Sequence, residues 1–247
     1  EIKNFSSFGV MVDCSRNAVM TPQKVKEYAD LLKKMNYNML MLYTENTYEI
    51  PDEPYFGYLR GRYTIAEMKE LDAYAASLGI TLIPCIQTLA HLNAIFRWEQ
   101  YPRDCNDILL CGDERVYTFI DRMFSTLAKC FKSRKVHLGM DEAHMLGRGQ
   151  YLTLNGYKDP IQVFVEHLNR VTEIVGRYGF KPMLWGDMFY RLLNGGEYYE
   201  NGKKVVFDKD TVASLPKNVE LVYWDYYSTD TAHYEKMFSS YQQFENP

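Results

Sequence analysis

The sequence has no excess of basic residues and no long apolar run. Its 247 residues include 28 Lys and Arg against 32 Asp and Glu, which gives a net charge of −4. Such a balance offers little to a nucleic-acid phosphate backbone. No window approaches the ~18 uninterrupted apolar residues that a membrane-spanning helix needs, and no charged-then-apolar signal segment opens the chain. We therefore expect neither a nucleic acid nor a membrane as a partner.

Cysteine is scarce, and its spacing fits no metal cluster. The five cysteines are odd in number, and none belongs to a Cys-x-x-Cys pair. Three lie in apolar runs, so buried reduced thiols are expected, while a disulfide between Cys105 and Cys111 is left open. Unpaired thiols and the missing signal segment favour the cytoplasm, and secretion is left open.

Aromatic residues, in contrast, are abundant. Hydrophobic residues make up 47% of the chain, as in a packed globular domain, and 15% of all residues are aromatic. The 21 Tyr and 3 Trp exceed what a core needs and gather near the predicted strand ends and loops. Rings with a polar edge suit flat, hydroxyl-rich ligands, so the composition is consistent with a carbohydrate ligand.

Short apolar strands alternate with amphipathic helices along the chain. Strict alternation with nearly continuous apolar strands predicts a parallel α/β sheet covered by helices. Polar residues collect at the carboxyl ends of the strands, which favours a TIM (β/α)8-type barrel. The main alternative, an open doubly wound sheet, usually has a glycine-rich loop where this chain has Asp13-Cys14-Ser15-Arg16. Helices are predicted to begin near residues 21, 64, 113, 159 and 210, and strands to cover residues 8–13, 38–43, 80–85, 135–140, 182–185 and 219–224.

The number of strands falls short of a closed barrel. Six units in 247 residues is about 41 residues per unit, so eight units need roughly 330 residues. We therefore predict one TIM-type catalytic barrel domain over residues 1–247, truncated after about six β/α units, with the C-terminal units missing. The oligomeric state is left open.

Polar and aromatic side chains follow each predicted strand. Because the carboxyl ends of parallel strands meet at one rim, these side chains are predicted to form one site. The candidate residues are Asp13, Arg16, Glu45, Gln87, His91, Asp141, Glu142, Trp185, Asp187, Trp224, Asp225 and Tyr226.

The adjacent carboxyl groups of Asp141 and Glu142 are the strongest chemical signal. Like charges at one strand end raise the pKa of at least one group, so one can stay protonated while its neighbour is ionised. Cleavage of a glycosidic bond needs this division, with a proton for the leaving oxygen and negative charge near the oxocarbenium centre. A metal-ligating pair or a helix N-cap is the alternative interpretation.

The segment His137-Leu138-Gly139-Met140-Asp141-Glu142 resembles the His-x-Gly-x-Asp-Glu signature of glycoside hydrolase family 20, the β-N-acetylhexosaminidases. Further segments are similar to the hexosaminidase D-like branch of that family, namely Val10–Asp13 with residues 15–17, Leu42–Glu45 and Pro54–Gly57. The resemblance implies a (β/α)8 catalytic barrel that hydrolyses terminal β-linked GlcNAc or GalNAc from carbohydrate substrates.

Carried over residue by residue, the resemblance implies a substrate-assisted mechanism with no cofactor and no metal. Glu142 is expected to act as general acid and then as base. Asp141 is expected to orient the substrate's 2-acetamido group, whose carbonyl attacks the anomeric carbon. An oxazolinium ion forms, and water opens it with net retention, an exception to the scheme that uses two enzyme carboxylates.

The resemblance also implies roles for the surrounding residues. His91 and Glu45 are expected to form a relay that tunes Glu142, and Trp185 and Trp224 to form pocket walls. The segment Tyr223-Trp224-Asp225 resembles a family motif that grips the acetamido group, with Tyr226 or Tyr227 as alternatives to Tyr223. The expected substrate-binding residues are Asp13, Arg16, Trp185, Asp187, Tyr223, Trp224, Asp225 and Tyr226.

The chain departs from the family pattern at three places. An arginine that is common before the first-strand glycine is Phe8 here, so Arg16 is predicted to replace it. The third strand continues into Cys85-Ile86-Gln87, where an acid-rich segment is common, and the family's last Trp with its neighbouring acid has no counterpart before Pro247. A carbohydrate-binding relative without turnover is therefore kept as an alternative.

A metal-dependent barrel hydrolase is the third hypothesis, with Asp141, Glu142, His91 and Glu45 as ligands. The chain lacks the His-x-His pair or third strand-end histidine that such a site usually has. The preference between GlcNAc and GalNAc and the natural glycan are left open.

Three other histidines are expected to be structural, whereas His144, after the acid pair, is left open between the pocket and a loop. His137 lies within a predicted strand and is expected in the core, whereas His167 and His233 are expected at the surface.

Overall fold

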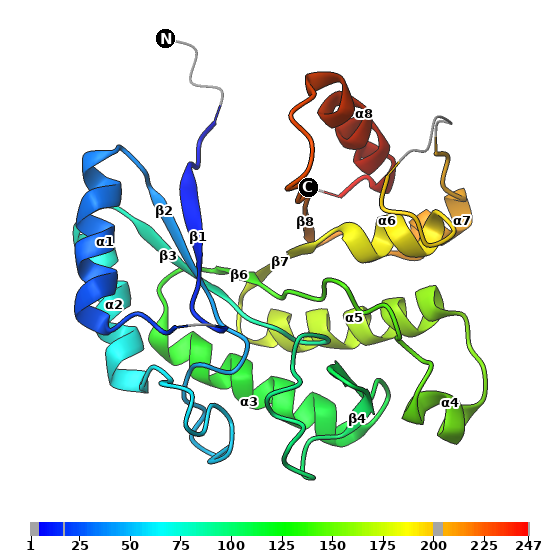
Figure 1. The fold of residues 1–247 in the computed structure, drawn as a ribbon, viewed down its shortest axis with the longest axis horizontal. Helices are drawn as coiled ribbons and strands as arrows, with labels where there is room; N and C mark the ends of the chain where they lie inside the picture. The colour runs from blue at the N-terminus through cyan, green and yellow to red at the C-terminus, as the bar shows by residue number, and fades with distance from the viewer. Residues whose placement is uncertain (1–4, 17, 200–204, 247) are drawn as a thin grey trace.

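The structure is a computed structural model that describes residues 5–16, 18–199 and 205–246. Six parallel strands form one sheet in the order β1-β2-β3-β6-β7-β8. Their bounds are Gly9–Asp13 (β1), Met39–Tyr43 (β2), Thr81–Cys85 (β3), Lys135–His137 (β6), Lys181–Trp185 (β7) and Glu220–Val222 (β8). The sheet curls into a half-barrel (Figure 1), which confirms the predicted TIM-type barrel shortened to six units.

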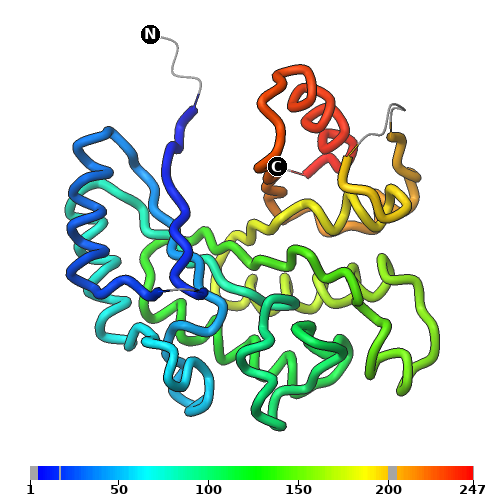
Figure 2. Tube along the Cα trace, in the orientation of Figure 1, coloured from blue at the N-terminus to red at the C-terminus, as the bar shows by residue number. Residues whose placement is uncertain are grey.

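Helices surround the outside of the curled sheet, and the sheet is open on one side. Strands β1 and β8 do not pair with each other in the described part of the chain, and Figure 2 shows them on opposite sides of the opening. No helix among the described residues is long and apolar enough to cross a membrane. The helices are Pro22–Lys34 (α1), Ile65–Ser77 (α2), Glu114–Cys130 (α3), Gln150–Asn155 (α4), Pro160–Arg177 (α5), Asp187–Leu193 (α6), Lys209–Ser214 (α7) and Thr231–Tyr241 (α8), with a 3-10 turn at Gln242–Phe244.

Capping residues explain where the first helices begin. The Thr21 side chain accepts a backbone N–H of the first turn of α1, and Pro22 supplies a backbone already suited to that turn. Thr64 and Glu67 form a capping box at the start of α2, in which each side chain bonds the other's backbone N–H.

The alternation of side chains along β2 separates the core from the site. Leu40 and Leu42 belong to the large core, whereas Met41 and Tyr43 belong to a second cluster of buried residues. The strands are in register, so that Asp13 and Cys85 lie beside Tyr43. The carboxyl ends of β1, β2 and β3 are therefore level at one rim.

Several short elements were not predicted from the sequence. These are α4, α6 and a two-stranded antiparallel hairpin formed by β4 (Arg103–Cys105) and β5 (Ile108–Leu109). Two predicted strands also end early, 135–140 at His137 and 219–224 at Val222. The first ends because Gly139 and Met140 adopt positive φ angles of 72° and 67°, which no strand accommodates.

His167 corrects one prediction. It was expected at the surface, but it is fully buried in α5. One ring nitrogen contacts the hydroxyl of Tyr117 at 3.1 Å and the other the carbonyl of Thr88 at 2.9 Å. His137 is buried as predicted, and all five cysteines are free thiols.

Candidate active site

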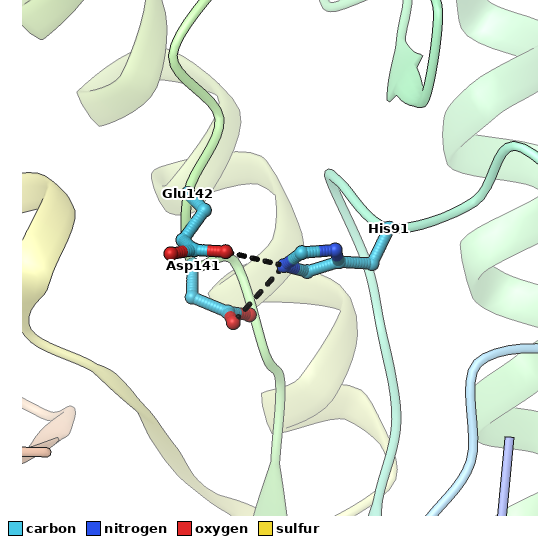
Figure 3. Close-up of side chains that lie close together, drawn as sticks. All are labelled: His91, Asp141 and Glu142. Atoms are coloured by element: carbon cyan, nitrogen blue, oxygen red, sulfur yellow. Dashed lines mark hydrogen bonds and ion pairs between the residues drawn. The ribbon is translucent and has the colours of Figure 1, made fainter. Parts of the chain in front are cut away.

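Asp141 and Glu142 lie in the turn that follows the end of β6 at His137, and the ring of His91 faces both of them (Figure 3). His91 Nε2 is 3.1 Å from Asp141 Oδ2 and 3.6 Å from Glu142 Oε2. The Asp141 side chain is 16% exposed and the Glu142 side chain 41%. The first carboxyl group is therefore held in the wall of the site, and the second is accessible to a ligand.

The backbone around the acid pair is held in an uncommon conformation. Met140, Glu142 and His91 have positive φ angles of 67°, 53° and 56°, a region that is costly for residues with a side chain. Gly139 has a φ of 72°, and a Cβ there would lie 2.2 Å from Gln87 Oε1. Only glycine fits this position, and strained backbone of this kind is typical of functional sites.

The partners of Asp141 keep its charge. Burial alone would raise the pKa of Asp141, but hydrogen bonds from His91 and Gln87 outweigh it, and the pKa lies below its ordinary value. The same hydrogen bond to Asp141 raises the pKa of His91, against the effect of its burial. A protonated imidazole beside an ionised carboxylate is thus favoured. The raised pKa that was predicted for a member of the acid pair does not fall on Asp141.

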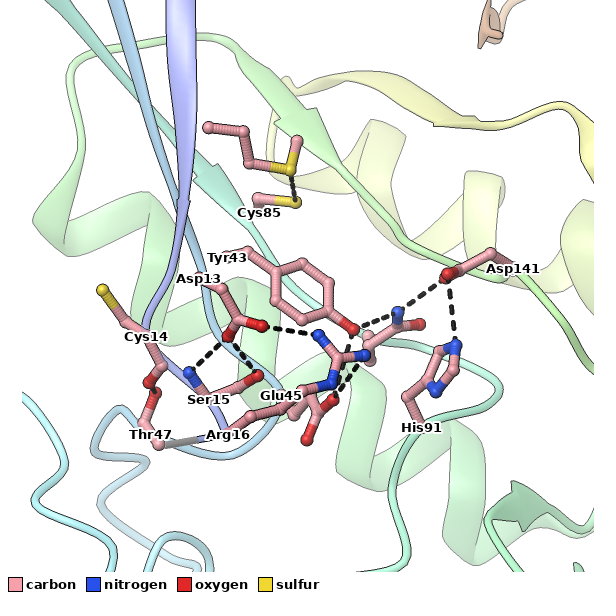
Figure 4. A network of polar contacts seen from close by, with 12 residues as sticks. Asp13, Cys14, Ser15, Arg16, Tyr43, Glu45, Thr47, Cys85, His91 and Asp141 are labelled. Atoms are coloured by element: carbon pink, nitrogen blue, oxygen red, sulfur yellow. Dashed lines mark hydrogen bonds and ion pairs between the residues drawn. The ribbon is translucent and has the colours of Figure 1, made fainter. Parts of the chain in front are cut away.

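A chain of polar contacts joins the ends of β1 and β2 (Figure 4). Asp13 accepts two hydrogen bonds from Ser15 and lies 2.6 Å from the guanidinium of Arg16. Arg16 is also 3.5 Å from Glu45 Oε1, and that oxygen accepts a hydrogen bond from the Tyr43 hydroxyl at 3.3 Å. Burial raises the pKa of Glu45. Glu45 therefore contacts Arg16 and Tyr43. The relay that was expected between Glu45 and His91 stays a prediction.

A cavity of about 420 Å³ opens between this network and the ends of β7 and β8. It brings together residues that are far apart in the sequence. Its lining residues are Met11, Asp13, Arg16, Tyr43, Asp141, Glu142, Trp185, Trp224, Tyr226 and Tyr227.

Asp187 connects the β7 side of the cavity to the acid pair. It is buried at the first turn of α6, and its Oδ2 accepts the backbone N–H of Glu142 at 3.0 Å. Burial raises the pKa of Asp187 to about 7, with a smaller contribution from the neighbouring carboxylates. Asp187 Oδ1 and Trp224 Nε1 are buried and make no hydrogen bond of normal geometry, although the indole lies near enough to lower the pKa of Asp187 somewhat.

Tyr223 and Asp225 form a separate group beside the cavity. The Tyr223 hydroxyl donates to Asp225 Oδ2 at 2.7 Å, and His233 Nε2 lies 2.8 Å from the same oxygen. The Tyr223 ring packs edge-on against Tyr241. Tyr223 and Asp225 do not line the cavity. Tyr226 does line it, and its side chain is 80% exposed. Which tyrosine contacts an acetamido group stays a prediction.

Some contributors were not recognised in the sequence. Tyr43 had a detectable signal, because it ends a strand whose alternate residues face inward. The place of Gln87 at a strand end predicts that it lies near the site, but no pattern in the sequence predicts its role. Tyr198 follows α6, its hydroxyl contacts His144, and its ring centroid is 5.9 Å from that of Trp224. No local pattern marks Tyr198, because only tertiary packing brings its loop to the site.

The same geometry bears on the metal hypothesis. His91, Asp141 and Glu142 each offer one ligand atom, and these atoms lie within 4.8 Å of one another. Glu45, the fourth ligand of that hypothesis, is not part of this group among the described residues.

Sequence comparison identifies the family. The profile described as "Glycosyl hydrolase family 20, catalytic domain" matches residues 5–239. "Beta-hexosaminidase 3" of Arabidopsis thaliana is 28% identical over 153 residues, covering 57% of this chain and 28% of that protein. "Hexosaminidase D" of Bos taurus is 23% identical over 228 residues, covering 83% of this chain and 60% of that protein. The chain thus spans less than two thirds of either relative.

Solved structures share the fold. The Streptomyces plicatus N-acetyl-β-hexosaminidase in complex with thio-NAglucal has a TM-score of 0.69 at 23% identity, covering 97% of this chain and 46% of its own. The Vibrio harveyi exo-β-N-acetylglucosaminidase in complex with N-acetylglucosamine has a TM-score of 0.72 at 18% identity, covering 96% and 40%. With the profile match over most of its length, the chain belongs to glycosyl hydrolase family 20.

Proposed function

We propose that the chain carries the acid pair of a retaining exo-β-N-acetylhexosaminidase, which removes terminal β-linked GlcNAc or GalNAc from glycans. The unequal surroundings of the two acids carry the proposal. Asp141 is bonded by His91 and Gln87, whereas the Glu142 side chain is 41% exposed and lines the cavity. One group is thus suited to fixed negative charge and the other to proton transfer.

The first step breaks the glycosidic bond. Glu142 donates its proton to the leaving oxygen while the carbonyl oxygen of the substrate's acetamido group attacks the anomeric carbon. Ionised Asp141 accepts the acetamido N–H and stabilises the positive charge of the resulting oxazolinium ion. No carboxylate of the protein becomes bonded to the sugar, in contrast to the usual retaining scheme.

The second step returns the acid to its starting state. Water attacks the anomeric carbon from the face that the leaving group vacated, and Glu142 takes a proton from it. The oxazolinium ring opens to the acetamide, and the two inversions give net retention. His91 keeps Asp141 ionised through both steps, because it stays hydrogen-bonded to Oδ2.

The aromatic residues of the cavity supply the sugar contacts. Trp185 and Trp224 line the same cavity as Asp13 and Arg16. An indole ring packs against the apolar face of a pyranose, while charged side chains bond its hydroxyl groups. The arrangement thus matches a small polar ligand that has one apolar face.

The direct test is hydrolysis of a chromogenic aryl β-N-acetylglucosaminide by this chain and by Glu142→Gln and Asp141→Asn. Loss of the acid or of the orienting carboxylate removes transition-state interactions, so we expect kcat to fall by about 10²- to 10⁴-fold in each.

The chain contains a matched control in a second adjacent acid pair. Asp113 and Glu114 lie at the start of α3 and outside the lining of the cavity. Asp113→Asn and Glu114→Gln should leave kcat within about twofold of the unaltered protein, as for surface changes away from a site. Equal losses in both pairs would contradict the proposal.

Sugar binding without turnover is the second candidate function, and the aromatic lining of the cavity, which includes Trp185, Trp224 and Tyr226, favours it. Tight binding of a thiazoline that mimics the oxazolinium ion, with no hydrolysis of the aryl substrate, would identify this case. A rate that a chelator abolishes would instead favour the metal hypothesis.

A further inference from the structure

The buried side-chain amide of Gln87 makes three hydrogen bonds to residues at the site. The residue is fully buried just beyond β3. Its Nε2 donates to Asp141 Oδ1 at 2.7 Å and to the Tyr43 hydroxyl oxygen at 2.9 Å, and its Oε1 accepts the backbone N–H of Met140 at 3.0 Å. One side chain thus contacts the carboxylate, the strained turn before it, and the neighbouring strand.

The orientation of the amide follows from its partners. A backbone N–H can only donate, so the atom that faces Met140 must be the oxygen of Gln87. The nitrogen must then face Asp141 and Tyr43, which both act as acceptors. The Tyr43 hydroxyl passes its own hydrogen to Glu45. The hydrogen bonds therefore run in a fixed direction, from Gln87 to Asp141 on one side and from Gln87 through Tyr43 to Glu45 on the other.

We propose that Gln87 is a positioning residue that fixes the orientation of Asp141 towards the substrate's acetamido group and holds the strained turn at Met140. The inference rests on the proposed function for its catalytic part. Asp141 Oδ1 is bonded by Gln87 and Oδ2 by His91. The plane of the carboxylate is thereby fixed by two donors from one loop, so its remaining acceptor positions point in set directions.

The contact with Met140 is equally specific. Gly139 has no room for a Cβ because Gln87 Oε1 would lie 2.2 Å from it. The amide therefore packs directly on the backbone that carries Asp141 and Glu142. Its oxygen stabilises a residue with a φ of 67°, a conformation that needs support from its surroundings.

Two substitutions separate the two parts of this role. Gln87→Glu keeps an oxygen for the Met140 N–H but replaces the donor to Asp141 by a second carboxyl group. Gln87→Met removes both interactions at similar volume. Thr88→Val is the matched control, because it removes a buried hydrogen bond to the Leu138 carbonyl from the next residue of the same segment.

Hydrogen exchange at the Met140 amide tests the turn without any need for turnover. We expect exchange to speed up by about tenfold or more in Gln87→Met, and to stay near the wild-type rate in Gln87→Glu and Thr88→Val. Unchanged protection of Met140 in Gln87→Met would overturn this part of the proposal.

Kinetics on substrates with increasing fluorination of the acetamido group test the orientation of Asp141. Fluorine weakens the attacking carbonyl oxygen, so the steepness of the rate loss reports on its participation. Both Gln87 variants should lower kcat by about 10- to 100-fold with a smaller change in KM, and should flatten the dependence on fluorination. Thr88→Val should change neither.

The outcomes distinguish the inference from the proposed function. Wild-type kcat and wild-type steepness in Gln87→Glu would overturn the role of Gln87 while leaving the function intact. A wild-type protein that neither hydrolyses the substrates nor binds the thiazoline would overturn the function, and the exchange data would still decide whether Gln87 holds the turn.

Discussion

The β1–β6 side of the cavity and the β7–β8 side differ in how their polar atoms are bonded. On the first side, Arg16, His91 and Asp141 all contact oppositely charged partners. On the second, Asp187 Oδ1 and Trp224 Nε1 make no hydrogen bond of normal geometry. The first side positions charge before a ligand arrives, which is what electrostatic catalysis requires. The second has one His–Asp pair outside the lining of the cavity and offers aromatic rings to a ligand, which suits recognition of a neutral sugar.

Each side contains one His–Asp pair, and substitutions in the two pairs should show the largest difference in kcat between the sides. His91 lies 3.1 Å from Asp141 and His233 lies 2.8 Å from Asp225. His91→Asn should lower kcat by about 10³-fold, because Asp141 loses the neighbouring charge that keeps it ionised. His233→Asn should change KM more than kcat and lower kcat by less than about tenfold. Steady-state kinetics on the aryl substrate would measure both, and similar kcat losses would contradict the division between the two sides.

The buried Asp187 should give the β7–β8 side a pH-dependent stability. Its pKa rises from 3.8 to about 7 on folding, so the contribution of its protonated form is complete below pH 3.8 and is lost as pH rises to about 7. Relative to Asp187→Asn, the free energy of unfolding should fall by roughly 3 to 4 kcal/mol over that range.

Urea unfolding of both proteins between pH 4 and pH 8 would measure this difference. Asp210→Asn, at the exposed first turn of α7, is a suitable control because no buried carboxyl group is altered. Parallel pH profiles for Asp187→Asn and the unaltered protein would show that Asp187 is not protonated in the folded state.

The indole of Trp224 should contribute to binding more than to chemistry. Trp224→Ala should weaken binding of the thiazoline by about 10- to 30-fold, since the ring supplies apolar contact in the cavity. The change in kcat for bound substrate should be smaller. Titration calorimetry would give the affinity, and a kcat loss as large as that of His91→Asn would place Trp224 in the catalytic machinery instead.

Tyr226 should have the smallest effect. It lines the cavity but is 80% exposed, so Tyr226→Ala removes little buried area. We expect less than about a threefold change in KM on the aryl substrate. A loss of more than about tenfold would identify Tyr226 as the residue that contacts the acetamido group, a role for which the sequence left several tyrosines open.

The β1–β6 side could be predicted from the sequence more fully than the β7–β8 side. Long periodic helices and apolar strands gave all six strands of the sheet and the longer helices between them, and adjacency in the sequence gave the acid pair Asp141 and Glu142 on the first side. His167 shows a signal that was overlooked, because its spacing from Phe164 and Val171 places it on the buried face of α5. The periodicity of the helix alone therefore predicts a buried position for His167.

Other features have no local signature. The partners of Gln87 come from β2 and from the turn after β6, and nothing in the sequence pairs them. Tyr198 reaches Trp224 from a loop whose path depends on tertiary packing. The raised pKa of Asp187 also has no local signature, because burial in the folded chain is its main cause and the neighbouring carboxylates add a smaller contribution.

The most direct test of the account is the rate of hydrolysis as fluorine atoms are added to the acetamido group of the substrate. If the substrate's own carbonyl attacks the anomeric carbon under the control of Asp141, log(kcat/KM) should fall steeply with each fluorine, and the slope should collapse in Asp141→Asn. A flat series in the unaltered protein would contradict substrate assistance and would require a nucleophile from the protein or from water.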